Sequence, residues 1–113
     1  MMSIEIELEP EVAEWYSSLT SENRDVVAVH IELLEEFGHL LRMPHSRALA
    51  DGLFELRFTM GRRAWRITYW HRGKGIYVLL TVFSKQQRTE QREIRRARKA
   101  LTLCRDAHLP ETT

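Results

Sequence analysis

Three strand-like runs follow one another in the middle of the chain, and the links between them are very short. The runs are LFELRFTM (53–60), RRAWRITYWHR (62–72) and IYVLLTVFSK (76–85), all rich in aromatic and β-branched residues. Met60-Gly61 and Gly73-Lys74-Gly75 supply the turns between them. A parallel crossover needs a dozen residues or more, so links this short force the three runs to be antiparallel neighbours in one sheet.

Helix-like segments lie on both sides of these runs. The alternating apolar residues of SIEIEL (3–8) predict a first, half-buried strand. Pro10 suits the first turn of a helix, and TSEN (20–23) is a start signal for a second helix that runs to about Phe37. A last helix is predicted from about residue 87 to 107, with an apolar stripe along one side.

The predicted element order is β-α-α-β-β-β-α, with GHLLRMPHSRALADG (38–52) as a connector. This order indicates an α+β domain: a mostly antiparallel sheet, two N-terminal helices packed on one face and a C-terminal helix. A chain of 113 residues fits a single domain over 1–113. Cys104 is the only cysteine, which excludes an internal disulfide, and we expect no metal centre and no cofactor.

The charges are strongly segregated along the chain. Residues 1–41 hold ten acidic residues and one arginine, whereas residues 42–113 hold sixteen Lys/Arg and six Asp/Glu. The basic part is therefore a candidate surface for a polyanion, although composition alone favours the simpler explanation, a solvated charged surface. No apolar run approaches the roughly 20 residues of a membrane helix, and the acidic start is unlike a secretory signal. We therefore expect a cytoplasmic protein without a membrane partner.

Side chains alternate across a strand, so residue parity predicts which of them share a face. The predicted core set of the third run is Ile76, Val78, Leu80 and Val82. If the apolar faces of the three runs coincide, Arg57, Arg66, Phe83 and Lys85 emerge together on the opposite face. Arginine binds phosphate bidentately and an exposed aromatic ring stacks on a base, so this group fits RNA. The alternative is that the arginines pair with Glu55 and that Phe83 packs under the last helix.

Several of these segments resemble the RelE/ParE toxin superfamily of bacterial toxin–antitoxin systems, in particular its HigB-like, phage-derived branch. The matching motifs are Leu-Phe-Glu-Leu-Arg (53–57), an arginine strand ending in aromatics (66–70), Phe-Ser-Lys (83–85) and Glu-Ile-Arg-Arg-Ala (93–97). Each motif is short, but their order and spacing together make a fairly specific signal. The resemblance covers about residues 45–105.

The resemblance implies a RelE-like fold and the toxin of a type II toxin–antitoxin system. Such a toxin is an mRNA endoribonuclease (an mRNA interferase), often dependent on the ribosome, that inhibits translation and arrests growth. Its partners would be mRNA, the ribosome and a helix-turn-helix antitoxin encoded nearby. By matching position, Arg57, Arg66 and Lys85 form the catalytic set and Phe83 stacks on a base. Many relatives have a second lysine after the first, whereas this chain has Gln86 there and Arg88 slightly later.

Metal-independent cleavage would use the RNA 2′-OH as nucleophile, which requires a base, an acid and charge stabilisation at the phosphate. Our hypothesis makes Lys85 the base and lets Arg57 and Arg66 hold the phosphate, with Glu55 as an alternative base. His30 is expected to pack in the core and His45 to lie in a surface loop, neither of them catalytic. Further RNA contacts are expected from cations of the last helix, among them Arg88, Arg92 and Arg95.

Two other functions fit the same sequence. A ParE-like inhibitor of DNA gyrase shares the fold and need not cut RNA. A catalytically inactive partner would hold the antitoxin and tune its regulation. Substitution of Arg57 and Lys85 discriminates between them, because only a nuclease loses toxicity while it keeps antitoxin binding.

Overall fold

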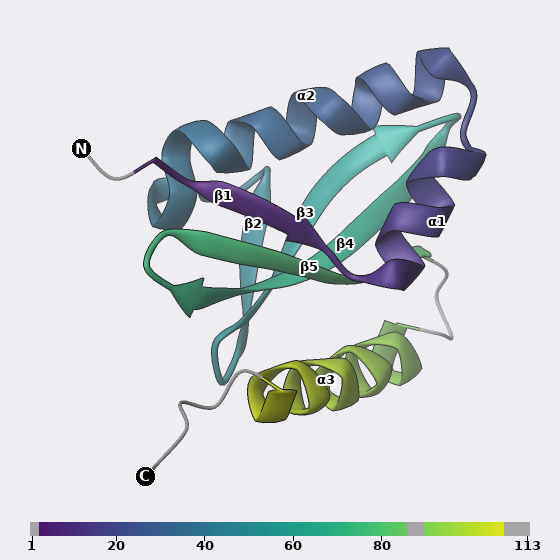
Figure 1. The fold of residues 1–113 in the computed structure, drawn as a ribbon. Helices are drawn as coiled ribbons and strands as arrows, with labels where there is room; N and C mark the ends of the chain where they lie inside the picture. The colour runs from purple at the N-terminus through teal and green to yellow at the C-terminus, as the bar shows by residue number, and fades with distance from the viewer. Residues whose placement is uncertain (1–2, 86–89, 108–113) are drawn as a thin grey trace, which may run out of the picture.

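The computed structural model describes residues 3–85 and 90–107, and these form the predicted α+β domain (Figure 1). The strands are β1 (Glu5–Leu8), β2 (Ser46–Ala50), β3 (Leu53–Met60), β4 (Arg63–Gly73) and β5 (Ile76–Ser84). The helices are α1 (Pro10–Ser18), α2 (Ser21–Phe37) and α3 (Glu90–Ala107), and a 3-10 turn, Gly38–Leu40, follows α2. In the described part of the chain, no helix has the length and hydrophobicity that crossing a membrane requires.

The strands form one sheet in the order β1-β5-β4-β3-β2 (Figure 1). The pairs β3–β4 and β4–β5 are antiparallel, as the short links predict. β1 lies parallel to β5, and the connection from β1 back to the sheet contains α1 and α2. The sheet is therefore mostly antiparallel, with one parallel edge strand.

One strand, β2, was not predicted from the sequence. The predicted connector contains β2, which pairs antiparallel with β3 through Ser46↔Leu56, Arg47↔Glu55 and Ala48↔Phe54. The segment SRALA carries no β-branched or aromatic residue, so its local preference for strand is weak. Pairing with the exposed edge of β3, rather than propensity, makes it a strand.

The first core lies between the sheet and the two N-terminal helices, which cover the same face of the sheet (Figure 1). Val12 of α1 and Val27 and Leu34 of α2 are almost completely buried in it. The helix starts follow the sequence signals: Pro10 occupies the first turn of α1, and the Thr20 side chain accepts a hydrogen bond from the Asn23 N–H at 3.2 Å. The expected placement of these helices on one face is confirmed.

The second core lies on the other face of the sheet, under α3 (Figure 1). Its helical side consists of Ala97, Leu101 and Cys104, which are buried against Leu53, Trp70, Val78 and Leu80 of the sheet. The Trp70 indole N–H contacts the Cys104 sulfur at 3.3 Å. Both faces of the central strands are therefore covered along part of their length.

The predicted parity of β5 is wrong over its first half. Thr81 pairs with Thr68 but Leu79 pairs with Tyr69, so the register shifts at Leu80. This bulge puts Tyr77 and Leu79 in the first core and Val78 and Leu80 in the second. An extra residue in one strand reverses the faces of the residues on either side of it. The residues after the bulge keep the predicted faces.

Candidate active site

The face of the sheet that α3 partly covers carries three rows of paired side chains near the start of α3. The middle row is Arg57, Arg66 and Phe83, which are direct cross-strand partners on β3, β4 and β5. One row joins Glu55, Thr68 and Thr81, and the Thr68 and Thr81 hydroxyls are 2.6 Å apart. Cross-strand partners have neighbouring side chains on the same face, so the predicted meeting of Arg57, Arg66 and Phe83 is confirmed.

Lys85 lies one row beyond the middle row. Its backbone N–H donates to the Ala64 carbonyl at 2.7 Å, which continues the β4–β5 ladder past the end of β5. The residue is exposed. Lys85 therefore places a cation at the rim of the middle row, which we call the arginine row.

A buried carboxylate lies beside the two arginines. Glu55 is 0% exposed, and its Oε2 lies 3.4 Å from Arg66 Nε and 3.8 Å from Arg57 Nη1. Burial raises the pKa of the Glu55 carboxyl above its ordinary value, although the charges of Arg66 and Arg57 oppose this shift. Neither carboxylate oxygen has a hydrogen-bond partner among the described residues. Such an arrangement is costly for stability and is typical of functional sites.

Arg66 is itself buried, at 5% exposure, and one of its terminal nitrogens donates to the Trp65 carbonyl at 2.9 Å. Burial lowers the pKa of the Arg66 guanidinium, and the charge of Arg57 acts in the same direction. Arg57 is more open, with 21% of its side chain exposed. A ligand therefore meets Arg57 first, while Arg66 lies in the wall behind it.

We expect the stability of the wild type and of Glu55→Gln to depend differently on pH. The folded-state pKa of Glu55 is raised above its ordinary value of 4.5, so the folded protein holds this proton more tightly than the unfolded chain. Its contribution to the free energy of unfolding is therefore fully present at acidic pH and is lost as the pH rises through the folded-state pKa. Glutamine has no such proton.

The wild type should accordingly lose stability relative to Glu55→Gln as the pH rises above 4.5 and through the raised folded-state pKa of the carboxyl. Urea denaturation at several pH values measures this difference. A difference that stays constant over the range would contradict a titrating carboxyl at this position.

The expected exposure of Phe83 is wrong. Only 7% of the residue is accessible. This burial agrees with the alternative to the extent that Phe83 is packed rather than exposed. Stacking of a base on Phe83 would need a rearrangement that exposes the ring.

The cations of α3 divide into two groups. Arg96, Arg98 and Arg105 are engaged within the protein, so the basic surface of α3 is narrower than its composition suggests. Arg98 bonds the Asp51 carboxylate at 3.1 Å and the Leu49 carbonyl at 2.9 Å. Arg105 bonds the Asp51 carbonyl at 2.8 Å and lies over the Trp70 ring.

The predicted RNA contacts on α3 fall in the other group. Arg92 and Arg95 are exposed and form no ion pair with another described residue. Arg88 lies outside the described residues. Two of the three predicted helical contacts are therefore available at the surface.

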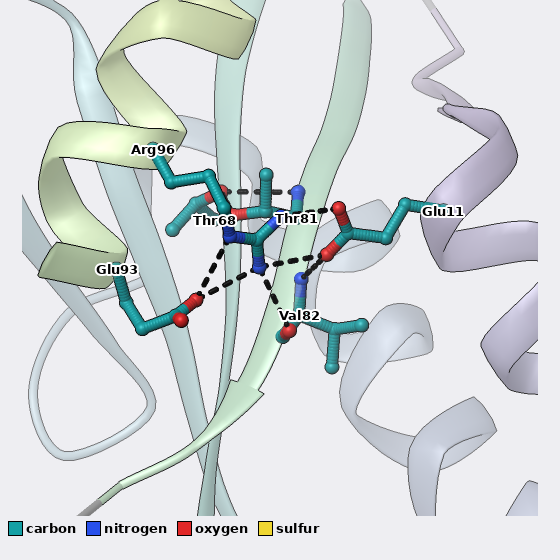
Figure 2. Close-up of polar contacts among 6 residues, drawn as sticks. All are labelled: Glu11, Thr68, Thr81, Val82, Glu93 and Arg96. Carbon is teal, nitrogen blue, oxygen red and sulfur yellow. Dashed lines mark hydrogen bonds and ion pairs between the residues drawn. The ribbon is translucent and has the colours of Figure 1, made fainter. Parts of the chain in front are cut away.

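Arg96 fixes α3 against the sheet and α1 (Figure 2). Its guanidinium bonds both carboxylate oxygens of Glu11, and Glu93 at 2.8 Å. Glu11 also accepts the Val82 N–H of β5 at 2.9 Å, and Arg96 donates to the Val82 carbonyl at 3.3 Å. Figure 2 shows this network beside the Thr68–Thr81 pair. It holds the start of α3 next to the row that contains Glu55.

A cleft of about 340 Å³ opens beside Arg57 and Arg66, and its other walls include His30, His45 and Thr59. His30 comes from α2 and His45 from the loop before β2. We expected His30 in the core and His45 in a surface loop, whereas both residues border the cleft that Arg57 and Arg66 line. A backbone hydrogen bond from the Arg57 N–H to the His45 carbonyl, at 2.8 Å, places His45 beside Arg57, and the sequence has no signal for it.

Comparison with known proteins identifies both a family and a fold. A family model described as phage-derived protein Gp49-like matches residues 14–102. None of the curated proteins in the comparison matches the chain. The free-state structure of an E. coli toxin RelE mutant aligns with a TM-score of 0.63 and 13% sequence identity, covering 90% of this chain and 98% of that one. The RelE-like fold implied by the sequence resemblance is therefore confirmed.

Proposed function

Because the chain belongs to the family of phage-derived Gp49-like proteins and has a RelE-like fold, we propose that it is the toxin of a type II toxin–antitoxin system. Its activity is endonucleolytic cleavage of mRNA, in the manner of an mRNA interferase acting on the ribosome. Translation stops as a consequence, and growth is arrested. The alternatives are a ParE-like gyrase inhibitor and an inactive partner of the antitoxin.

The observation that carries this proposal is the row of cations on β3 and β4. Two arginines are adjacent across the sheet, Lys85 lies one row away, and a cleft opens beside them. Arginine offers a planar fork that matches two phosphate oxygens, whereas lysine acts as a point charge. The cleft is therefore suited to one phosphodiester group of an RNA strand. A protein that only contacts gyrase has no need for such a convergence.

Each charged residue at or beside the cleft has a proposed role. Arg57, the more open arginine, contacts the phosphate and stabilises the charge that develops on it during cleavage. Arg66 adds positive charge from the wall of the cleft. Glu55 is too deeply buried to reach a substrate, so it is a positioning residue that holds the two guanidinium groups. Lys85 contacts the RNA backbone at the rim.

The partners follow from the exposed charges. Arg92 and Arg95 on α3 extend the cationic surface toward ribosomal RNA, and such phosphate contacts weaken steeply as salt increases. We propose that an acidic segment of a helix-turn-helix antitoxin, encoded beside the toxin, covers the same cations. The ribosome orients the mRNA and supplies part of the catalytic geometry, so the toxin itself needs few catalytic groups.

Cleavage-site mapping on a defined mRNA, with and without programmed ribosomes, tests the proposal. We expect cuts only when ribosomes are present, and we expect Lys85→Ala to reduce them by about tenfold or more, since it removes a cation that contacts the RNA backbone. Protein that arrests growth but produces no cuts in either condition would sink the nuclease and support gyrase inhibition. Protein that neither cuts RNA nor arrests growth would support an inactive, antitoxin-binding role.

A further inference from the structure

The cleft lies where the pairing of β2 with β3 stops. β2 pairs with β3 as far as Ser46↔Leu56. One further backbone hydrogen bond follows, from the Arg57 N–H to the His45 carbonyl, at 2.8 Å. Next to this bond, α2 and the loop before β2 border the cleft and contribute one histidine each. Two histidines and two arginines therefore border one opening at the edge of the sheet.

His30 is held in a defined orientation. Its Nδ1 lies 2.9 Å from the Val26 carbonyl, one turn earlier in α2. A carbonyl oxygen only accepts hydrogen bonds, so Nδ1 must carry the proton and Nε2 is the free nitrogen. The ring also stacks on Phe58, with 5.0 Å between the ring centroids and 28° between the planes. His30 thus presents a fixed nitrogen with a lone pair when the ring is neutral.

His45 is held by its backbone rather than by its ring. Its backbone carbonyl accepts a hydrogen bond from the backbone N–H of Arg57, whereas its ring makes no hydrogen bond with another described residue. The rings of His45 and His30 are 6.3 Å apart between centroids. That separation leaves the two imidazoles near each other without direct stacking. The His45 side chain is therefore available to a ligand that enters beside Arg57.

We propose that His30 and His45 are the proton-transfer pair for RNA cleavage in this cleft, with His30 as the base and His45 as the acid. This inference rests on the proposed endoribonuclease function and assigns its acid–base chemistry. Cleavage through the 2′-OH needs one group that takes a proton and another that gives one. Imidazole is the side chain best suited to both tasks near neutral pH.

The steps balance without any further reactant. Nε2 of neutral His30 takes the proton of the 2′-OH, and the 2′-oxygen attacks phosphorus. The bond between phosphorus and the 5′-oxygen breaks, and protonated His45 gives its proton to that oxygen. The products are a 2′,3′-cyclic phosphate and a 5′-OH, and Arg57 stabilises the phosphate throughout. His30 ends protonated and His45 neutral, and one exchange of each with water restores the pair.

This assignment replaces Lys85 as the base. No described lysine lines the cleft, and Lys85 lies at the rim of the arginine row. An ammonium group must first lose its proton to act as a base, whereas a neutral imidazole already has a lone pair. Lys85 keeps its role as a contact for the RNA backbone.

Single-turnover cleavage by the full-length protein tests the pair, under whichever ribosome condition supports cleavage by the wild type. We expect His45→Ala to lower the rate by about 10²-fold or more, the usual contribution of a general acid. RNA affinity should change by less than about threefold, because the group acts in the transition state. Added imidazole should restore part of the lost activity in His45→Ala and none in Arg57→Ala. Alanine keeps the backbone carbonyl that accepts from Arg57, so the fold should be preserved.

Two further variants complete the test. His30→Asn keeps an amide able to donate to the Val26 carbonyl but removes Nε2, and we expect a similar loss of rate. His39→Ala is the matched control, because His39 is exposed on the 3-10 turn and does not line the cleft. We expect it to cleave at the wild-type rate.

Unchanged cleavage by His45→Ala would overturn the proposal, and so would a loss that imidazole does not restore. Both results require a wild type that cuts RNA, so they leave the proposed function intact. A wild type that cuts no RNA under any condition defeats the proposed function first, and the proton-transfer pair with it.

Discussion

Arg57→Ala is expected to lower the rate of mRNA cleavage by about 10²- to 10³-fold, the usual cost of removing one group that stabilises transition-state charge. We expect this large effect because the Arg57 side chain is accessible to a ligand and lies in the cleft. A fifth of its side chain is exposed, it lines the cleft, and it is the direct cross-strand partner of Arg66. Growth arrest on expression in bacteria should be lost in parallel. Cleavage kinetics and growth curves measure the two effects.

Two control variants separate chemistry from charge and folding. Arg57→Lys keeps the charge but not the planar fork, so we expect intermediate activity if bidentate phosphate binding matters. Arg63→Ala removes an exposed arginine at the start of β4 that does not line the cleft. Its cleavage rate should stay within about threefold of the wild-type rate. All three variants should still bind the antitoxin. Full activity of Arg57→Ala would show that the arginine row takes no part in cleavage.

The arginine row could be predicted from the sequence because β3 and β4 alternate strictly. Phe54, Leu56 and Phe58 fall on one face of β3, so Arg57 must fall on the other, and the short turn to β4 fixes which residue lies opposite it. The order of the elements was predictable for the same reason. Local patterns and short links are sufficient where neighbours in sequence are also neighbours in space.

The burial of the site could not be predicted, because it depends on contacts between distant parts of the chain. Phe83 is 7% exposed, and the position of α3 on the sheet depends on the ion pair of Arg96 with Glu11 of α1. An arginine in a basic helix gives no sign in the sequence that its partner lies some eighty residues earlier. The same holds for His45, which reaches the cleft only because an unpredicted strand, β2, brings its loop to the edge of β3.

The bulge in β5 could not be predicted for a different reason. The run IYVLLTVF is apolar at almost every position, so one register explains its hydrophobicity as well as the other. Such a run is typical of a strand with both faces covered, which is how the structure uses it. The insertion of one residue then costs no burial, because each displaced side chain finds a core on the other face.

Leu79→Ala and Leu80→Ala are each expected to lower the free energy of unfolding by about 2–5 kcal/mol, the usual range for a buried leucine. These residues are adjacent in the chain, yet they belong to different cores. Leu79 is 0% exposed under α1 and α2, and Leu80 is 2% exposed under α3. Urea denaturation of the two variants measures both costs, and melting temperatures should fall in both.

Leu103→Ala is the control, because Leu103 is 62% exposed on α3 and should change stability by no more than about 0.5 kcal/mol. The two core variants also have different expected effects on function. The cavity left by Leu80→Ala lies next to Ala97, Leu101 and Cys104, so it should loosen α3, whereas Leu79→Ala leaves that contact in place. Proteolysis within α3 should therefore be faster in Leu80→Ala at equal global stability. If only one of the two leucines proved costly, the strand would have a single buried face at this point.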